Sequence, residues 1–170
     1  VKAEHEGIFS PVNRIYIATD MDGEILVAEG DAESFRTLLE DPETIKYGYD
    51  LKFQRNILKH NGIELNGKYM DIELMHYLIN PEKSHKIEIL AKSYLEIDIE
   101  ENDEKKEEVT LSLFDEPQEE EKKSRFPEAA ATMLLGGKIW EEMGEMDLQS
   151  LYDTMEEPLL KVLSKMEIEG

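Results

Sequence analysis

The stretch that decides the fold is Ile45–Tyr94, which reads IKYGYDLKFQRNILKHNGIELNGKYMDIELMHYLINPEKSHKIEILAKSY. A β-prone run at Thr44–Tyr47 leads into it and is interrupted by Gly48, and a second extended run is predicted at Ile63–Met70. Apolar residues recur at helical spacing after each run. Because strand, helix, strand and helix follow one another, this part of the chain predicts an α/β sheet.

Both predicted helices carry start and stop signals. Asp50 and Asp71 are the expected N-caps, because an aspartate oxygen can accept hydrogen bonds from the free N–H groups of a first helical turn. Gly62 suits a left-handed C-terminal cap, and Asn80-Pro81 stops the second helix. The apolar positions expected to face the core are Leu51, Phe53, Ile57 and Leu58, followed by Leu74, Tyr77 and Leu78.

Two segments resemble the 3′–5′ exonuclease domain of bacterial DNA polymerase I, a family A polymerase. That family reads glycine, any residue, asparagine, leucine, lysine, an aromatic residue and aspartate, and this chain reads Gly48-Tyr49-Asp50-Leu51-Lys52-Phe53-Gln54. Gly62-Ile63-Glu64-Leu65 and Asp71–Ile79 match the segments that follow in the family, and Met155–Leu163 is similar to the helix that leads into the polymerase domain. The resemblance implies an α/β, ribonuclease H-like 3′–5′ exonuclease fold with a mixed sheet flanked by helices.

The N-terminal part is expected to supply a three-stranded meander. Val1–Glu6 is a possible strand, and its abrupt start suggests an excised fragment. Arg14–Thr19 and Glu24–Ala28 are predicted to form a hairpin around Asp22-Gly23. Asp31 is expected to cap a helix whose buried stripe consists of Phe35, Leu38 and Leu39 within Ala32–Leu39.

We predict three segments: an exonuclease-like α/β core at 1–95, an acidic insertion at 96–126, and C-terminal helices at 127–170 that complete the domain and lead into a polymerase domain. Glu96–Arg125 holds thirteen Asp and Glu against five Lys and Arg. Such a composition buries too little apolar surface to offset chain entropy, so we expect a disordered linker.

Two helices are predicted after the insertion, at Pro127–Met146 and Leu148–Glu169. Gly136-Gly137 weakens the first of them and is expected to allow close packing or a kink. Trp140 is predicted to be a core anchor, and Pro158 to mark a kink or a second helix start.

The global composition restricts the function. The net charge of −21 would repel DNA, so any tight DNA binding is expected through the full-length protein. The 170 residues contain no cysteine, which excludes disulfides and thiolate metal sites and fits a cytoplasmic location. With no run of eighteen apolar residues, no membrane partner is expected.

Active relatives hold two divalent ions, Mg²⁺ or Mn²⁺, with carboxylates from three motifs. For the first motif, aspartate-x-glutamate, the local candidates are Glu4 and Glu6, which are either residual ligands or a chance strand end. The second motif has Gln54 in place of aspartate, and an amide brings no charge to a metal. We therefore predict a vestigial site near Glu4, Glu6 and Gln54, without catalytic residues, metal or other cofactor.

The third motif is tyrosine, three residues and aspartate. Phe126–Trp140 contains neither residue type, and Tyr152 with Glu156 imitates the spacing several turns too late. The four histidines lack ligand spacing and are expected at surface or half-buried positions: His5, His60, His76 and His85. Lys52 is expected to form a surface ion pair, rather than to contact DNA phosphate.

The sequence leaves three hypotheses open. The first is an inactive proofreading-domain fold that serves as a scaffold for the polymerase domain of the same chain. The second is an active nuclease that uses Glu4 and Glu6 with Asp50 or Asp71. The third is an interaction module that recruits a replication or repair partner.

The apolar island Val109–Phe114 in the insertion supports the third hypothesis. Thr110–Phe114 (TLSLF) resembles the sliding-clamp peptide of bacterial replication proteins, which reads glutamine, leucine, serine or aspartate, leucine and phenylalanine. Leu111, Leu113 and Phe114 would be the anchors in an apolar groove. The alternatives are a short edge strand or a chance match.

Overall fold

The computed structural model describes residues 2–4, 12, 14–21, 24–99 and 126–170. Its hydrogen-bonded strands form two small sheets. The first is antiparallel, in the order β1-β2-β3, and comprises β1 (Lys2–Glu4), β2 (Arg14–Met21) and β3 (Glu24–Gly30). The second is parallel and comprises β4 (Lys46–Gly48) and β5 (Tyr69–Asp71).

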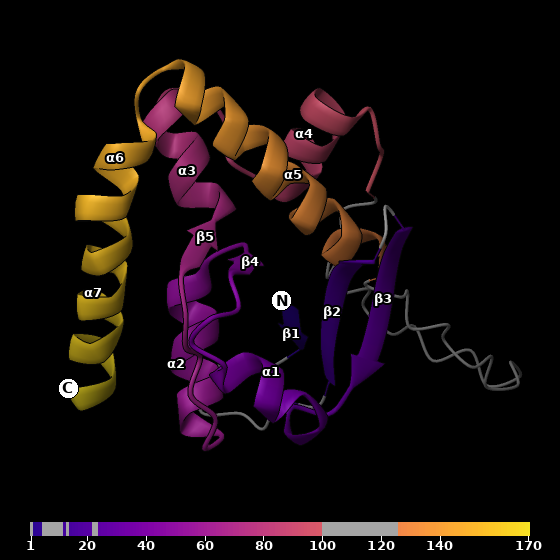
Figure 1. The fold of residues 1–170 in the computed structure, drawn as a ribbon, viewed down its shortest axis with the longest axis vertical. Coiled ribbons are helices and arrows are strands. Elements are labelled where there is room, and N and C mark those ends of the chain that lie inside the picture. Colours follow the sequence, from indigo (N-terminus) through magenta and orange to yellow (C-terminus); the bar gives the residue numbers. More distant parts are fainter. Residues whose placement is uncertain (1, 5–11, 13, 22–23, 100–125) are drawn as a thin grey trace, which may run out of the picture.

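Helices account for most of the remaining described residues. The short ones are η1 (Glu33–Phe35), α1 (Arg36–Glu40), α4 (Ile87–Leu90), η2 (Ala91–Leu95), α6 (Gln149–Leu151) and η3 (Tyr152–Glu156). The longer ones are α2 (Leu51–His60), α3 (Ile72–Ile79), α5 (Phe126–Glu145) and α7 (Glu157–Glu169). In Figure 1, α5 contacts β2 at one end and α3 at the other, and α7 lies alongside α2. This arrangement is the expected α/β fold with sheets flanked by helices.

The core has two apolar clusters that meet at β5. Tyr69 packs in the first, with residues of β2, α1, α2 and α7. The next residue, Met70, packs in the second, with residues of α3, α4 and α5. Successive side chains of a strand point to opposite faces, so two adjacent residues of β5 connect both clusters. The position of β5 therefore controls how the C-terminal helices meet the rest of the domain.

The caps predicted at Asp50 and Asp71 are confirmed, whereas the helix predicted after Asp31 is a 3₁₀ turn followed by α1, and neither has a side-chain cap from its own N-cap residue. The Asp50 carboxylate accepts a hydrogen bond from Phe53 N at 3.3 Å, and that of Asp71 accepts one from Leu74 N at 3.2 Å. Gly62 has a left-handed φ of 77°. Gly136 allows close packing of α5 on β4, because a Cβ there would lie 2.1 Å from a ring carbon of Tyr47.

Several predicted boundaries and exposures were wrong. The extended run at Ile63–Met70 is a strand only from Tyr69, because Asn66 N bonds to Leu39 O outside any sheet. Leu38 and Tyr77 continue the apolar periodicity of their helices but are 40% and 50% exposed, and Tyr77 has His85 as an edge-on ring neighbour at 5.6 Å. His76, expected near the surface, is buried.

The last predicted helix, Leu148–Glu169, contains a π-helical segment. This segment, η3, ends two residues before Pro158. Proline has no N–H and its ring crowds the carbonyl of the preceding turn, and a wider turn accommodates both effects. Trp140 packs against the second cluster as expected, although only half-buried, with its ring edge-on to Tyr152 at 5.9 Å.

Three sets of expectations fall outside the described residues. These are the disorder of the insertion at 100–125, the clamp-like anchors Leu111, Leu113 and Phe114, and the turn at Asp22-Gly23. Within the described part, every helix is too short or too polar to cross a bilayer.

Candidate functional site

The first exonuclease motif lies at the end of β1. Glu4 pairs in antiparallel register with Arg14 of β2, and Glu6 falls outside the described residues. The backbone therefore places Glu4 at a strand end, as the sequence indicates.

At the second motif, Gln54 is 5% exposed in the second turn of α2. Its Nε2 donates a hydrogen bond to Tyr49 O at 2.6 Å, and within the described residues its buried Oε1 has no partner. A carboxylate in this position would face the Tyr49 carbonyl oxygen and be repelled, whereas the amide nitrogen is held by it. The neutral amide brings no charge to a two-metal centre, whose two divalent ions are otherwise balanced by carboxylates.

Tyr152, which imitates the third motif, is fully buried at the edge of β5. Its hydroxyl donates to Tyr69 O at 3.0 Å and accepts from Asp71 N at 2.8 Å. Glu157 Oε1 accepts from Tyr69 N at 3.1 Å. Side chains of the C-terminal helices thus take the place of a neighbouring strand along this edge.

Asp71, a candidate of the active-nuclease hypothesis, is buried and committed to helix capping. Its Oδ1 caps α3, and its Oδ2 accepts a bond from Leu51 N of α2 at 2.6 Å. Burial raises the pKa of Asp71 to about 6, and the charges of Asp50 and Glu73 act in the same direction. One carboxylate therefore fixes the N-termini of two helices, and both of its oxygens are used.

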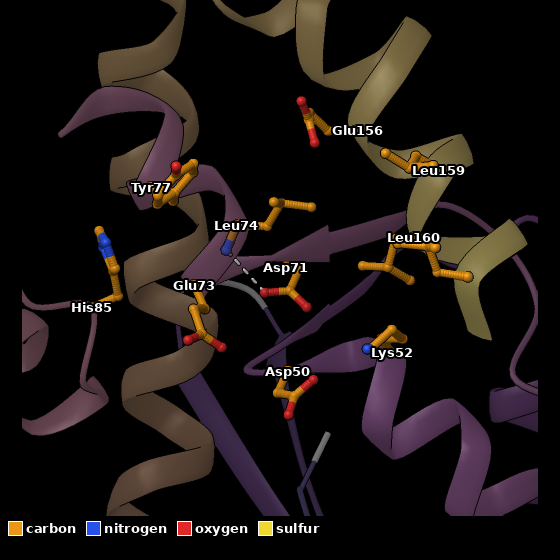
Figure 2. A pocket seen from close by; sticks show the side chains of 11 residues that line it. Asp50, Lys52, Asp71, Glu73, Leu74, Tyr77, His85, Glu156, Leu159 and Leu160 are labelled. Atoms are coloured by element: carbon orange, nitrogen blue, oxygen red, sulfur yellow. Dashed lines mark hydrogen bonds between the residues drawn. The ribbon is translucent and has the colours of Figure 1, made fainter. Parts of the chain in front are cut away.

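A cavity of about 320 Å³ opens where α2, α3 and the C-terminal helices meet (Figure 2). Its polar lining consists of Asp50, Lys52, Asp71, Glu73, Tyr77, His85 and Glu156, and its apolar lining of Leu74, Leu159, Leu160 and Leu163. Asp50, Asp71 and Glu73 lie close together in Figure 2, and the leucines of α7 lie across from them. The cavity thus combines carboxylates with an apolar wall.

Polar contacts hold α7 on α2. Ser164 is fully buried, and its hydroxyl donates to Asn56 Oδ1 at 2.5 Å and accepts from Arg55 at 2.6 Å. Glu167 accepts from Asn56 at 2.7 Å and pairs with Lys52 at 2.6 Å, which confirms the expected ion pair of Lys52. The contacts of Glu157 and Ser164 were not identified from the sequence. The signal that could have found them is a series of polar residues at helical spacing.

The outward face of the C-terminal helices is apolar. Met155, Leu159, Val162 and Met166 recur at intervals of four, three and four residues and are each about half exposed or more. We call this set, with the adjacent Leu151 and Leu163, the outer stripe. Its spacing is that of one face of a helix, so the side chains form a continuous surface.

The histidines do not form a ligand set with acids. Nδ1 of His76 lies 2.7 Å from Nδ1 of His85, so the two rings share one proton in a hydrogen bond. Burial lowers the pKa of His76, and His85 lowers it further. Among the described residues, no three His, Asp or Glu side chains are grouped so that they could hold a metal ion.

Comparisons with known proteins identify the family. The family model described as "DNA polymerase I, ribonuclease H-like domain" matches residues 13–105. The chain is also similar to DNA polymerase I of Synechocystis sp., with 31% identity over 124 residues. That match covers 70% of this chain and 12% of the relative. The chain belongs to the family of ribonuclease H-like domains of DNA polymerase I.

Proposed function

We propose that this domain is an exonuclease fold that no longer hydrolyses DNA and instead braces the polymerase portion of its protein. The outer stripe is the observation that carries the proposal. Half-exposed leucine, valine and methionine side chains along one helix face are typical of a surface that a partner covers. The family relation supplies the partner, since polymerase I proteins extend far beyond this domain.

The architecture around the stripe supports a mechanical role. Tyr152 and Glu157 fix the C-terminal helices to β5, and Ser164 and Glu167 fix them to α2. These contacts leave the apolar side chains facing outward. The C-terminal helices are therefore fixed to β5, where the two core clusters meet.

The chemistry at the motif positions supports the loss of hydrolysis. Gln54 is neutral and held by a backbone carbonyl, and Asp71 uses both carboxylate oxygens to cap helices. The net charge of −21 also opposes the approach of a DNA strand. These features disfavour the alternative of an active nuclease that uses Glu4 and Glu6 with Asp50 or Asp71.

A charge placed in the stripe tests the brace. In the full-length protein, Leu159→Glu with Val162→Glu should lower the melting temperature of the polymerase portion by about 4 °C or more, because buried charges prevent docking. The control is Lys165→Glu, which changes the net charge by the same amount at an exposed position of α7. This variant should leave the melting temperature of the polymerase portion unchanged. Equal melting of the two variants would contradict the brace.

A nuclease assay tests the loss of activity. The chain should leave single-stranded and mismatched DNA ends intact with either Mg²⁺ or Mn²⁺, and Gln54→Asp alone should not restore cleavage. Calorimetry with Mn²⁺ should show no binding. Cleavage that disappears on Glu4→Ala or Glu6→Ala would establish the active-nuclease alternative instead.

A second candidate function rests on Thr110–Phe114. As a clamp-binding tether, a peptide of residues 107–116 should bind the sliding clamp at about micromolar strength, roughly 8 kcal/mol. Leu113→Ala with Phe114→Ala should abolish that binding and leave the melting temperature of the domain unchanged. If this double variant unfolds the domain, the island belongs to the core and the tether idea fails.

A further inference from the structure

The acidic cavity and the outer stripe form one continuous surface. Leu159 and Leu163 belong to both: they are more than 40% exposed on α7 and they line the cavity. A partner that covers the stripe therefore covers the mouth of the cavity as well, and must match the chemistry inside it.

Two of the cavity's carboxylates have no hydrogen-bonding partner among the described residues. Asp50 and Asp71 accept backbone N–H groups, and Lys52 is paired with Glu167. Glu73 and Glu156 make no hydrogen bond or salt bridge within the described residues, and Figure 2 shows both beside the open volume. Burial raises the pKa of Glu73, the charge of Asp50 raises it further, and His85 opposes this. Covering these carboxylates with a neutral surface would carry a desolvation penalty.

The charge of the cavity selects the class of occupant. DNA is excluded because phosphates would meet carboxylates, and a second copy of this chain carries the same net charge of −21. A polymerase portion has to present basic side chains, because neutralising phosphates supplies much of the affinity for DNA. The polymerase portion, which is the partner proposed for the outer stripe, is thus also a source of basic side chains.

We propose that the cavity receives basic side chains, lysine or arginine, from the polymerase portion of the same protein, one with its charged end at Glu73 and one with its charged end at Glu156. This inference rests on the proposed brace. The aliphatic stem of such a side chain would lie along Leu74, Leu159 and Leu163, which is how long cationic side chains cover apolar surface. The stripe would supply contact area, and these ion pairs would set the register of docking.

Methionine oxidation in the full-length protein tests the proposal. Met155 lies in the stripe, so its rate of oxidation by dilute peroxide reports how often the face is uncovered. Glu73→Gln with Glu156→Gln should speed oxidation of Met155 about fivefold, because the cations lose their partners. The matched variant Glu141→Gln with Glu145→Gln, on the exposed face of α5, should not. Raising the salt concentration should speed the reaction in the unaltered protein and have little effect in the cavity variant.

The outcomes separate the two ideas. An unchanged or slower rate in the cavity variant would overturn the cation proposal, because amides are cheaper to desolvate than unpaired carboxylates. If Met155 in the unaltered protein is already oxidised as fast as Met146, at the end of α5, the stripe is uncovered and the brace itself fails.

Discussion

The helices α5 and α7 are both amphipathic, yet they turn opposite faces toward the domain. Leu135, Ile139 and Met143 of α5 are fully buried in the second core cluster. In α7, by contrast, Glu157 and Ser164 are buried, while Val162 and Met166 are exposed. Leu160 of α7 packs in the first core cluster, but the other apolar residues of this helix remain available to another surface. The contrast fits the proposal that α7 docks on another part of the protein, whereas α5 belongs to the core of this domain.

The sharpest way to break this contrast is to truncate one leucine in each helix. In the 170-residue chain, Leu135→Ala should cost about 2–5 kcal/mol of unfolding free energy, because it leaves a cavity in the core. Leu159→Ala should change it by no more than about 0.5 kcal/mol, because that side chain is half exposed. Urea denaturation measures both values. Similar losses would show that the stripe stabilises the domain itself.

The buried carboxylate of Asp71 can be tested by measuring stability at different pH values. Burial raises the pKa of Asp71 from its ordinary value of 3.8 to about 6. Between these values the folded state binds more protons than the unfolded state, so the contribution of Asp71 is present below about pH 4 and lost as the pH rises through 6. Relative to Asp71→Asn, the unaltered chain should lose up to about 3 kcal/mol across this window.

The measurement is the difference in unfolding free energy between the two proteins at a series of pH values. Groups other than Asp71 titrate in both proteins and cancel to first order. A difference that is flat, or that rises with pH, would show that the Asp71 carboxylate is better solvated than its burial indicates.

A smaller effect is expected from Tyr152, the main tie between the C-terminal helices and β5. Tyr152→Phe leaves Tyr69 O and Asp71 N buried without this partner, which should cost about 1–3 kcal/mol. Tyr77→Phe is the matched control, because that hydroxyl is on a half-exposed side chain, and it should be neutral. If both variants are neutral, water replaces the hydroxyl and the tie is weaker than described.

Local signals in the sequence were sufficient for much of the fold. Asp50, Asp71 and Gly62 act within four residues of their own helix ends, so cap chemistry alone located them. The same holds for the hairpin strands and for α5. The family motif around Gln54 indicated the fold class. Glutamine at this position, where the family has aspartate, indicated the missing charge.

The remaining features depend on contacts that no local pattern contains. Asp71 also caps α2 through Leu51, twenty residues away, and Glu157 bonds to Tyr69 across 88 residues. The burial of His76 depends in the same way on neighbours that come later in the chain. The carboxylates of the cavity come from three separate segments of the chain, so they could not be grouped before the fold was known.

The most direct test of the brace compares three methionines in the full-length protein by mass spectrometry after brief oxidation. In this domain Met155 and Met166 of the stripe are 59% and 62% exposed, and Met146 at the end of α5 is 49% exposed. If α7 docks on the polymerase portion, Met155 and Met166 should oxidise about tenfold more slowly than Met146, because the stripe is covered. If all three react at similar rates, the stripe faces solvent and the proposed function is wrong.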